Sequence, residues 1–79
     1  MSFHYSSLKT SPRLQRVLLY LRRHAKYGAT TAMIATATGA MSVSTVISEL
    51  RANGHPTACK FEGVTKDGRK IFRYTLEAA

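Results

Sequence analysis

The hydrophobic periodicity of the chain changes at Pro56, and this change limits the folds that are available to it. Before Pro56, apolar residues recur at three- and four-residue spacing, which indicates helices. After it, the segments "TACKFEGV" and "RKIFRYTL" show the alternation that is typical of strands. The pair Asp67-Gly68 lies between these segments and is a strong signal for a two-residue hairpin turn. We therefore expect helices followed by one two-stranded β-hairpin.

The first expected helix is marked at both ends. Ser11 is a suitable N-cap and Pro12 fits the first helical position, whereas Gly28 is the expected end. One side of this helix is apolar and should face the core; it consists of Leu14, Val17, Leu18, Leu21 and Ala25. The arginines of this helix lie off that stripe, and we expect at least half of them to be solvated.

Two shorter helices should follow, joined by a tight link. Thr30 or Thr31 caps the second helix, which ends at Gly39. Ser42 caps the third helix, "VSTVISELRA", which stops at the Asn-Gly pair that comes after it. The apolar side of the third helix consists of Val43, Val46, Ile47 and Leu50.

The position of the turn sets the expected register of the hairpin. With Asp67-Gly68 as the turn, the facing pairs are Lys66–Arg69, Val64–Ile71, Glu62–Arg73, Phe61–Tyr74 and Cys59–Leu76. The apolar side chains of both strands then share one face, which can cover the helices. Glu62 meets Arg73 on the other face, which is a favourable cross-strand pair. In this register Cys59 belongs to the core.

Three helices with a tight link between the second and third, followed by a hairpin, resemble the winged helix-turn-helix family, in particular its small bacterial and phage members. The resemblance is carried by "TTAMIATATGAMSVSTVISELRANGH" and "GRKIFRYTL" and covers about residues 12–76. It implies an α+β fold, with a three-helix helix-turn-helix core followed by a two-stranded β-hairpin wing, over residues 11–77 after an N-terminal tail of residues 1–10. It also implies DNA binding, with the third helix in the major groove and the wing on the backbone or minor groove.

The charge of the chain is consistent with that partner. Twelve Lys and Arg residues face four Asp and Glu residues, for a net charge of +8. Such an excess favours an anionic partner, and double-stranded DNA is the partner we expect. No apolar run approaches the roughly 18 residues that span a membrane. The N-terminus lacks the pattern of a signal peptide, and the single cysteine excludes an intrachain disulfide, so we expect a cytoplasmic, nucleoid-associated protein.

The outward side of the third helix carries small hydroxyl side chains where Lys, Glu, Gln or Arg are more usual. Short hydroxyl groups allow close approach to base edges and hydrogen-bond to bases or phosphates. The expected DNA-binding residues are Thr31, Ser42, Ser44, Thr45, Ser48, Arg51, Lys66, Arg69 and Lys70. The alternatives are helix capping for Ser42, a solvated charge for Arg51 and protection of a strand edge for the wing cations. Glu49 is expected on or beside the DNA face, where it would repel phosphate.

The sequence offers no catalytic site, no metal site, no cofactor and no small-molecule substrate. The three histidines are widely spaced, and the acids form no pair suited to acid–base chemistry. A second hypothesis is an interaction module that binds an acidic surface of a host protein, such as a polymerase or nuclease. RNA binding is a third, disfavoured because the sequence suggests no exposed aromatic pair on the sheet. A homodimer is possible, and its candidate contacts are Leu19, Tyr20 and the aromatic residues of the tail.

Overall fold

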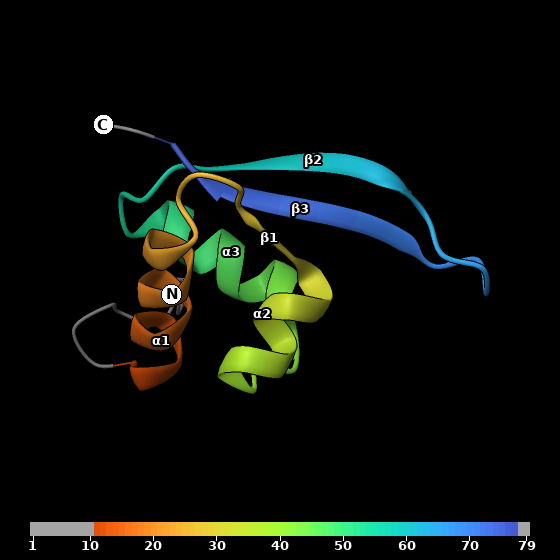
Figure 1. The fold of residues 1–79 in the computed structure, drawn as a ribbon. Coiled ribbons are helices and arrows are strands. Elements are labelled where there is room, and N and C mark those ends of the chain that lie inside the picture. Colours follow the sequence, from red (N-terminus) through yellow and green to blue (C-terminus); the bar gives the residue numbers. More distant parts are fainter. Residues whose placement is uncertain (1–10, 78–79) are drawn as a thin grey trace, which may run out of the picture.

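Three helices precede an antiparallel hairpin in the computed structural model, which describes residues 11–77 (Figure 1). The helices are α1 (Pro12–Arg23), α2 (Thr31–Thr38) and α3 (Val43–Ala52). The hairpin consists of β2 (Thr57–Val64) and β3 (Lys70–Leu76), and a short strand, β1 (Ala29–Thr30), completes a sheet of order β1-β3-β2. The predicted α+β fold, with a helix-turn-helix core and a hairpin wing, is therefore confirmed. We call β2, β3 and the loop between them the wing.

The starts of α1 and α2 follow the local chemistry that the sequence predicts. The Ser11 hydroxyl accepts a hydrogen bond from the backbone N–H of Leu14 at 3.3 Å. The Thr30 hydroxyl accepts from the N–H of Met33 at 3.2 Å, so Thr30 rather than Thr31 caps α2. Each cap satisfies one of the N–H groups that have no partner within the helix. Gly39 ends α2 in the left-handed conformation, as predicted.

The helix α1 ends at Arg23, earlier than predicted, and a turn leads to Gly28. Ala25 is consequently exposed and does not extend the apolar stripe. Gly28 has φ +72°, and a Cβ atom there would lie 2.6 Å from the carbonyl oxygen of Tyr74 on β3. This close approach allows β1 to pair with β3, with Ala29 opposite Tyr74. The sequence analysis did not anticipate this strand.

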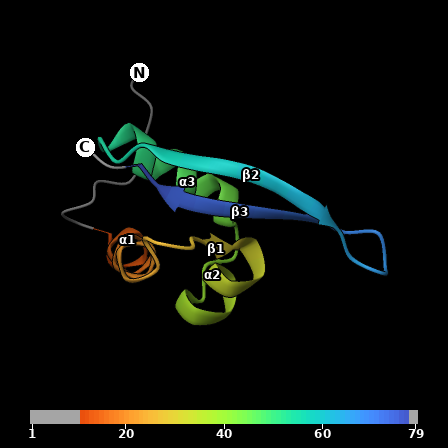
Figure 2. The ribbon, with the colours of Figure 1, turned by 45° about the horizontal axis from the view of Figure 1, so that its top comes forward.

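The core lies between the helices and the sheet. In the view of Figure 1, the helices lie below the sheet and the wing extends beyond them to the right. Figure 2 shows the same extension from above. The largest fully buried side chains come from all three helices: Leu14, Val17, Leu21, Ile34, Val46, Ile47 and Leu50. The predicted apolar sides of α1, except Ala25, and of α3 therefore face the core.

The hairpin register differs from the predicted one. Cys59 faces Tyr74 and Phe61 faces Phe72, so the predicted partners at this end of the hairpin are wrong by two residues. The first cause is a wider turn: the Thr65 N–H donates to the carbonyl of Arg69 at 2.7 Å, and residues 66–68 form the loop. The predicted pairs Lys66–Arg69 and Val64–Ile71 are therefore wrong as well.

A β-bulge at Glu62 is the second cause of the shift in register. Such a bulge places two residues of one strand opposite one of the other. Glu62 nevertheless reaches Arg73, as predicted, with 2.7 Å between its Oε2 and the arginine Nε. This hydrogen bond lowers the pKa of Glu62. Arg73 also donates to the carbonyl of Tyr27 at 3.2 Å, so it links the wing to the segment before β1.

Cys59 is exposed, which corrects its predicted place in the core. The reason is that β2 is the outer strand of the sheet, and its residues after Thr57 are exposed or half-buried. Tyr74 on β3 is buried, whereas Phe61 on β2 is 53% exposed. Phe72 and Leu76 are partly buried and pack against the core.

Candidate nucleic-acid interface

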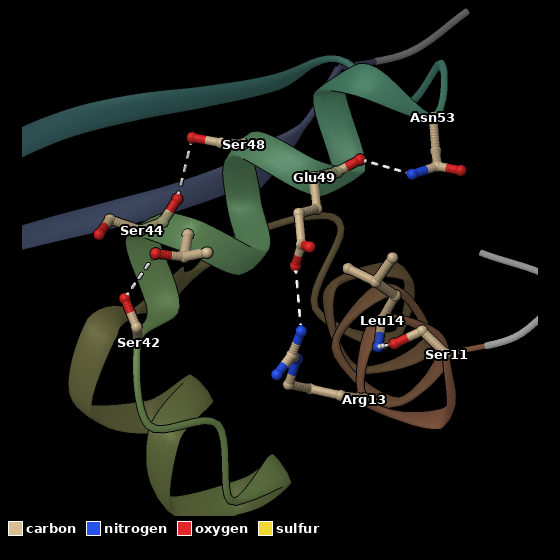
Figure 3. Close-up of polar contacts among 9 residues, drawn as sticks. Ser11, Arg13, Leu14, Ser42, Ser44, Ser48, Glu49 and Asn53 are labelled. Atoms are coloured by element: carbon tan, nitrogen blue, oxygen red, sulfur yellow. Dashed lines mark hydrogen bonds and ion pairs between the residues drawn. The ribbon is translucent and has the colours of Figure 1, made fainter. Parts of the chain in front are cut away.

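The small hydroxyl side chains of α3 lie on the molecular surface. Ser44, Thr45 and Ser48 are all exposed, and we call them the hydroxyl face. The opposite side of α3 is buried through Val46 and Leu50. Figure 3 shows Ser44 and Ser48 on the side of α3 toward which β2 and β3 run out of the picture. The hydroxyl face and the wing therefore lie on the same flank of the molecule.

Hydrogen bonds within α3 orient these hydroxyl groups. Ser42 occupies the N-cap position, but its hydroxyl makes no bond to the helix backbone and lies 2.8 Å from the Thr45 hydroxyl. The Ser48 hydroxyl donates to the carbonyl of Ser44 at 3.1 Å. Because its proton is used in this bond, the Ser48 oxygen is left to accept hydrogen bonds from outside. The predicted capping bond of Ser42 is absent, so no serine hydroxyl binds the first N–H groups of α3, which are donors suited to phosphate.

Glu49 does not lie on the hydroxyl face, which corrects the sequence-based expectation. It is only 6% exposed, and its Oε1 accepts a hydrogen bond from Nη2 of Arg13 at 3.3 Å. Figure 3 shows the Glu49 side chain pointing toward α1, away from Ser44 and Ser48. Glu49 would therefore not repel phosphate at the hydroxyl face, because α1 covers this side of α3.

Replacing Glu49 with glutamine is expected to lower the free energy of unfolding by about 1 kcal/mol, because a charged hydrogen bond becomes a neutral one. Binding of duplex DNA should change by less than about twofold, since the site lies outside the interface and salt screens its charge. Urea denaturation and a duplex titration measure the two effects. A gain in affinity without a loss of stability would place Glu49 back at the DNA face.

Arg51 has a structural role that the sequence reasoning did not identify. Its Nε and Nη2 both donate to the carbonyl oxygen of Thr57, at 3.1 and 2.7 Å. The side chain thus ties the end of α3 to the start of β2. If Arg51 contacts a phosphate, as predicted, that contact has to exist beside the bonds to Thr57 or replace them.

Thr31, at the start of α2, is exposed, and its side chain hydrogen-bonds Tyr74. Burial raises the pKa of Tyr74, and the Cys59 side chain raises this pKa further. The phenol is therefore neutral at physiological pH. This contact connects α2 to β3 of the wing, and Thr31 lies on the surface there.

The tip of the wing is basic and exposed. Lys66, Arg69 and Lys70, which we call the wing cations, are all exposed. Asp67 lies among them; its Oδ2 is 3.0 Å from the Nε of Arg69, and Thr65 donates a hydrogen bond to its Oδ1. The bonds from Thr65 and Arg69 lower the pKa of Asp67, so it stays ionised. Three cations and one carboxylate leave the tip with two positive charges in excess.

Two of the four arginines of α1 take part in packing between helices. Arg13 pairs with Glu49, and Arg16 Nε donates to the carbonyl of Thr38 at the end of α2, at 3.3 Å. Arg22 and Arg23 are exposed in the last turn of α1. In Figure 1, α1 lies at the opposite end of the molecule from the wing tip. These arginines therefore lie away from the wing cations.

The candidate dimer contacts are only partly within the described residues. Leu19 is 48% exposed, whereas Tyr20 packs against the core with its ring 4.1 Å from that of His24. The tail aromatics Phe3 and Tyr5 lie outside residues 11–77. Leu19 is thus the candidate that the structure places on the surface.

Within residues 11–77, no group of three His, Cys, Asp or Glu side chains could hold a metal ion. No single helix of this part of the chain is long and apolar enough to cross a membrane; α2 and α3 together would pass by length and composition, but they are bent by 88°. No protein-family model matches the sequence, and no similar curated protein or solved structure was found.

Proposed function

We propose that this protein binds double-stranded DNA as a winged helix-turn-helix protein. The helix α3 enters the major groove, and the wing contacts the adjacent backbone or minor groove. The observation that carries this proposal is the common flank of the exposed hydroxyl face and the wing. The protein acts in the cytoplasm on the nucleoid, as a small transcriptional regulator or a phage or mobile-element DNA-binding factor, and not as an enzyme.

The chemistry of the two surfaces supports a division of roles. Wing cations that contact phosphates contribute affinity, and this affinity falls as salt rises. The hydroxyl face of α3 carries short side chains, which permit hydrogen bonds to base edges at close range. It carries no Arg, Asn or Gln, the side chains that form bidentate pairs with guanine and adenine. We therefore infer a preference for certain sequences rather than strict recognition of one.

A negative charge on the hydroxyl face tests the placement of α3. Ser48→Glu is expected to weaken duplex binding about tenfold, because a carboxylate would face the phosphates of the groove. Thr36→Glu is the matched control, since it adds the same charge at an exposed position of α2 outside the hydroxyl face. Fluorescence anisotropy with a labelled random-sequence duplex measures both affinities. Equal binding by the two variants would exclude α3 as the groove helix.

A second candidate function is the binding of an acidic surface on a host protein. The observation that favours it is the exposure of Phe61 and Val64 on the wing, at 53% and 56%, beside the wing cations. Exposed apolar groups with basic neighbours are typical of protein contacts as well as of nucleic-acid contacts. Failure to bind any duplex at low salt would favour this function over the first.

A further inference from the structure

A hollow of about 480 Å³ lies between the start of α2 and the wing. Ala32 and Ala35 line it from α2, and Ile71 and Phe72 line it from β3. Arg69 and Lys70 also line it, and no acidic side chain does. The hollow is therefore lined by apolar groups, an aromatic ring, three threonines and two cations. It lies between α2 and the wing, next to the surface that we propose for duplex DNA.

An aromatic pair extends this lining onto the outer strand. The rings of Phe61 and Phe72 lie 5.6 Å apart at 58°, and Phe61 is 53% exposed. Phe72 is partly buried, so Phe61 is the exposed member of this pair. Aromatic rings beside cations are the combination that holds unpaired bases, because the ring stacks on the base while the cations neutralise its phosphate.

We propose that this hollow receives one unpaired base of the bound DNA, with the base against Phe72 and its phosphate at Arg69 and Lys70. This inference rests on the proposed function, because the duplex delivers the base to the wing. The favoured substrate is then a duplex with a bulged or otherwise unpaired nucleotide rather than a fully paired one. Charge complementarity supports a nucleotide, since the cations line the same hollow as the apolar wall.

Three probes of identical flanking sequence test the proposal by fluorescence anisotropy. The first is a fully paired duplex of about 20 base pairs, the second carries one unpaired thymine, and the third carries an abasic residue in place of that thymine. The protein is expected to bind the thymine bulge about tenfold more tightly than the paired duplex, because one base stacked on an aromatic ring contributes about that much affinity. The abasic bulge should bind within about twofold of the paired duplex, because it has no base to stack.

A matched pair of variants assigns the preference to the hollow. Ala32→Leu fills the hollow from an exposed position of α2 and should abolish the preference for the bulge while paired-duplex binding persists. Ala37→Leu makes the same change at an exposed position of the same helix outside the hollow, and should keep the preference. Fluorescence of 2-aminopurine at the unpaired position should rise when the base leaves the DNA stack. Ala32→Leu should suppress this rise.

The outcomes separate this inference from the proposed function. Binding of the paired duplex without a preference for the thymine bulge overturns the inference alone. An equal preference for the abasic bulge also overturns it, because the gain would then come from the bending of a bulged duplex. Failure to bind any of the three probes overturns the proposed function and, with it, the inference. A thymine preference that Ala32→Leu removes and Ala37→Leu keeps supports the inference.

Discussion

Replacing Lys66, Arg69 and Lys70 together with alanine is expected to weaken duplex binding on the order of 100-fold at low salt. The three side chains are exposed at the wing tip, and the wing extends from the side of α3 that carries Ser44 and Ser48. Each phosphate that a cation neutralises contributes about 0.9 to the slope of log K against log salt concentration. The slope should therefore become shallower by about 2 to 3 units. The loss should be similar for all duplex sequences, because phosphate contacts carry no sequence information.

The control for this variant removes the same charge from elsewhere. Arg22 and Arg23 are exposed in the last turn of α1, and Lys26 is exposed in the turn that follows. The helix α1 lies at the opposite end of the molecule from the wing tip. Alanine at these three positions gives the same net charge as the wing variant. Its affinity should stay within about threefold of the parent protein, because salt screens distant charges. If both triple variants lose equal affinity, binding reflects net charge alone and the wing has no special role.

Replacing Gly28 with alanine is expected to lower the free energy of unfolding by about 3 kcal/mol, from steric conflict and backbone strain together. Gly28 adopts φ +72°, and a Cβ atom there would lie 2.5 Å from the Thr75 hydroxyl oxygen and 2.6 Å from the Tyr74 carbonyl. The backbone of β3 would have to move, and β1 would separate from the sheet. A domain of this size has a total stability of only about 4 to 12 kcal/mol, so this loss is severe.

Gly39→Ala separates the two causes of this loss. Gly39 has φ +75°, close to that of Gly28, but a Cβ atom there would meet nothing within 4 Å. Its replacement should cost only the left-handed backbone strain, about 1 kcal/mol. Urea denaturation followed by circular dichroism measures both variants. Equal losses at the two glycines would mean that the approach of Gly28 to β3 adds no constraint.

The order of the elements could be predicted from the sequence because each one is set by local signals. The caps at Ser11 and Thr30, the end of α2 at Gly39 and the change of periodicity at Pro56 depend on residues close together in the chain. The strand β1 could not be predicted this way. It has two residues, and it exists because Gly28 lets the chain approach β3, which comes more than forty residues later.

The hairpin shows how a correct local signal gives an incorrect register. Gly68 does lie in the turn, with φ +89°, but the Thr65 hydroxyl accepts the N–H of Arg69 at 3.0 Å and favours a longer loop. The longer loop and the bulge at Glu62 together move the strand partners by two residues. The two shifts preserve which side chains share a face, because strands alternate every second residue.

The candidate site was predicted in part. The exposure of the hydroxyl face follows from the spacing of apolar residues on the other side of α3, and the exposure of the wing cations follows from their place near a turn. The place of Glu49 depends on Arg13, a partner on α1 that is distant in sequence. The place of Arg51 depends on the backbone carbonyl of Thr57, at the start of β2. The pattern of a single helix contains no information about such partners.

The most direct test of the common interface is a map of the residues that respond to DNA. A fully paired duplex added to the isotope-labelled protein should shift the amide NMR signals of residues 43–48 and 65–70 together, along one titration curve. The signals of residues 20–26, which lie away from the wing tip, should stay unchanged. Shifts confined to residues 20–26, or a wing that responds while α3 does not, would contradict a single interface formed by the hydroxyl face and the wing.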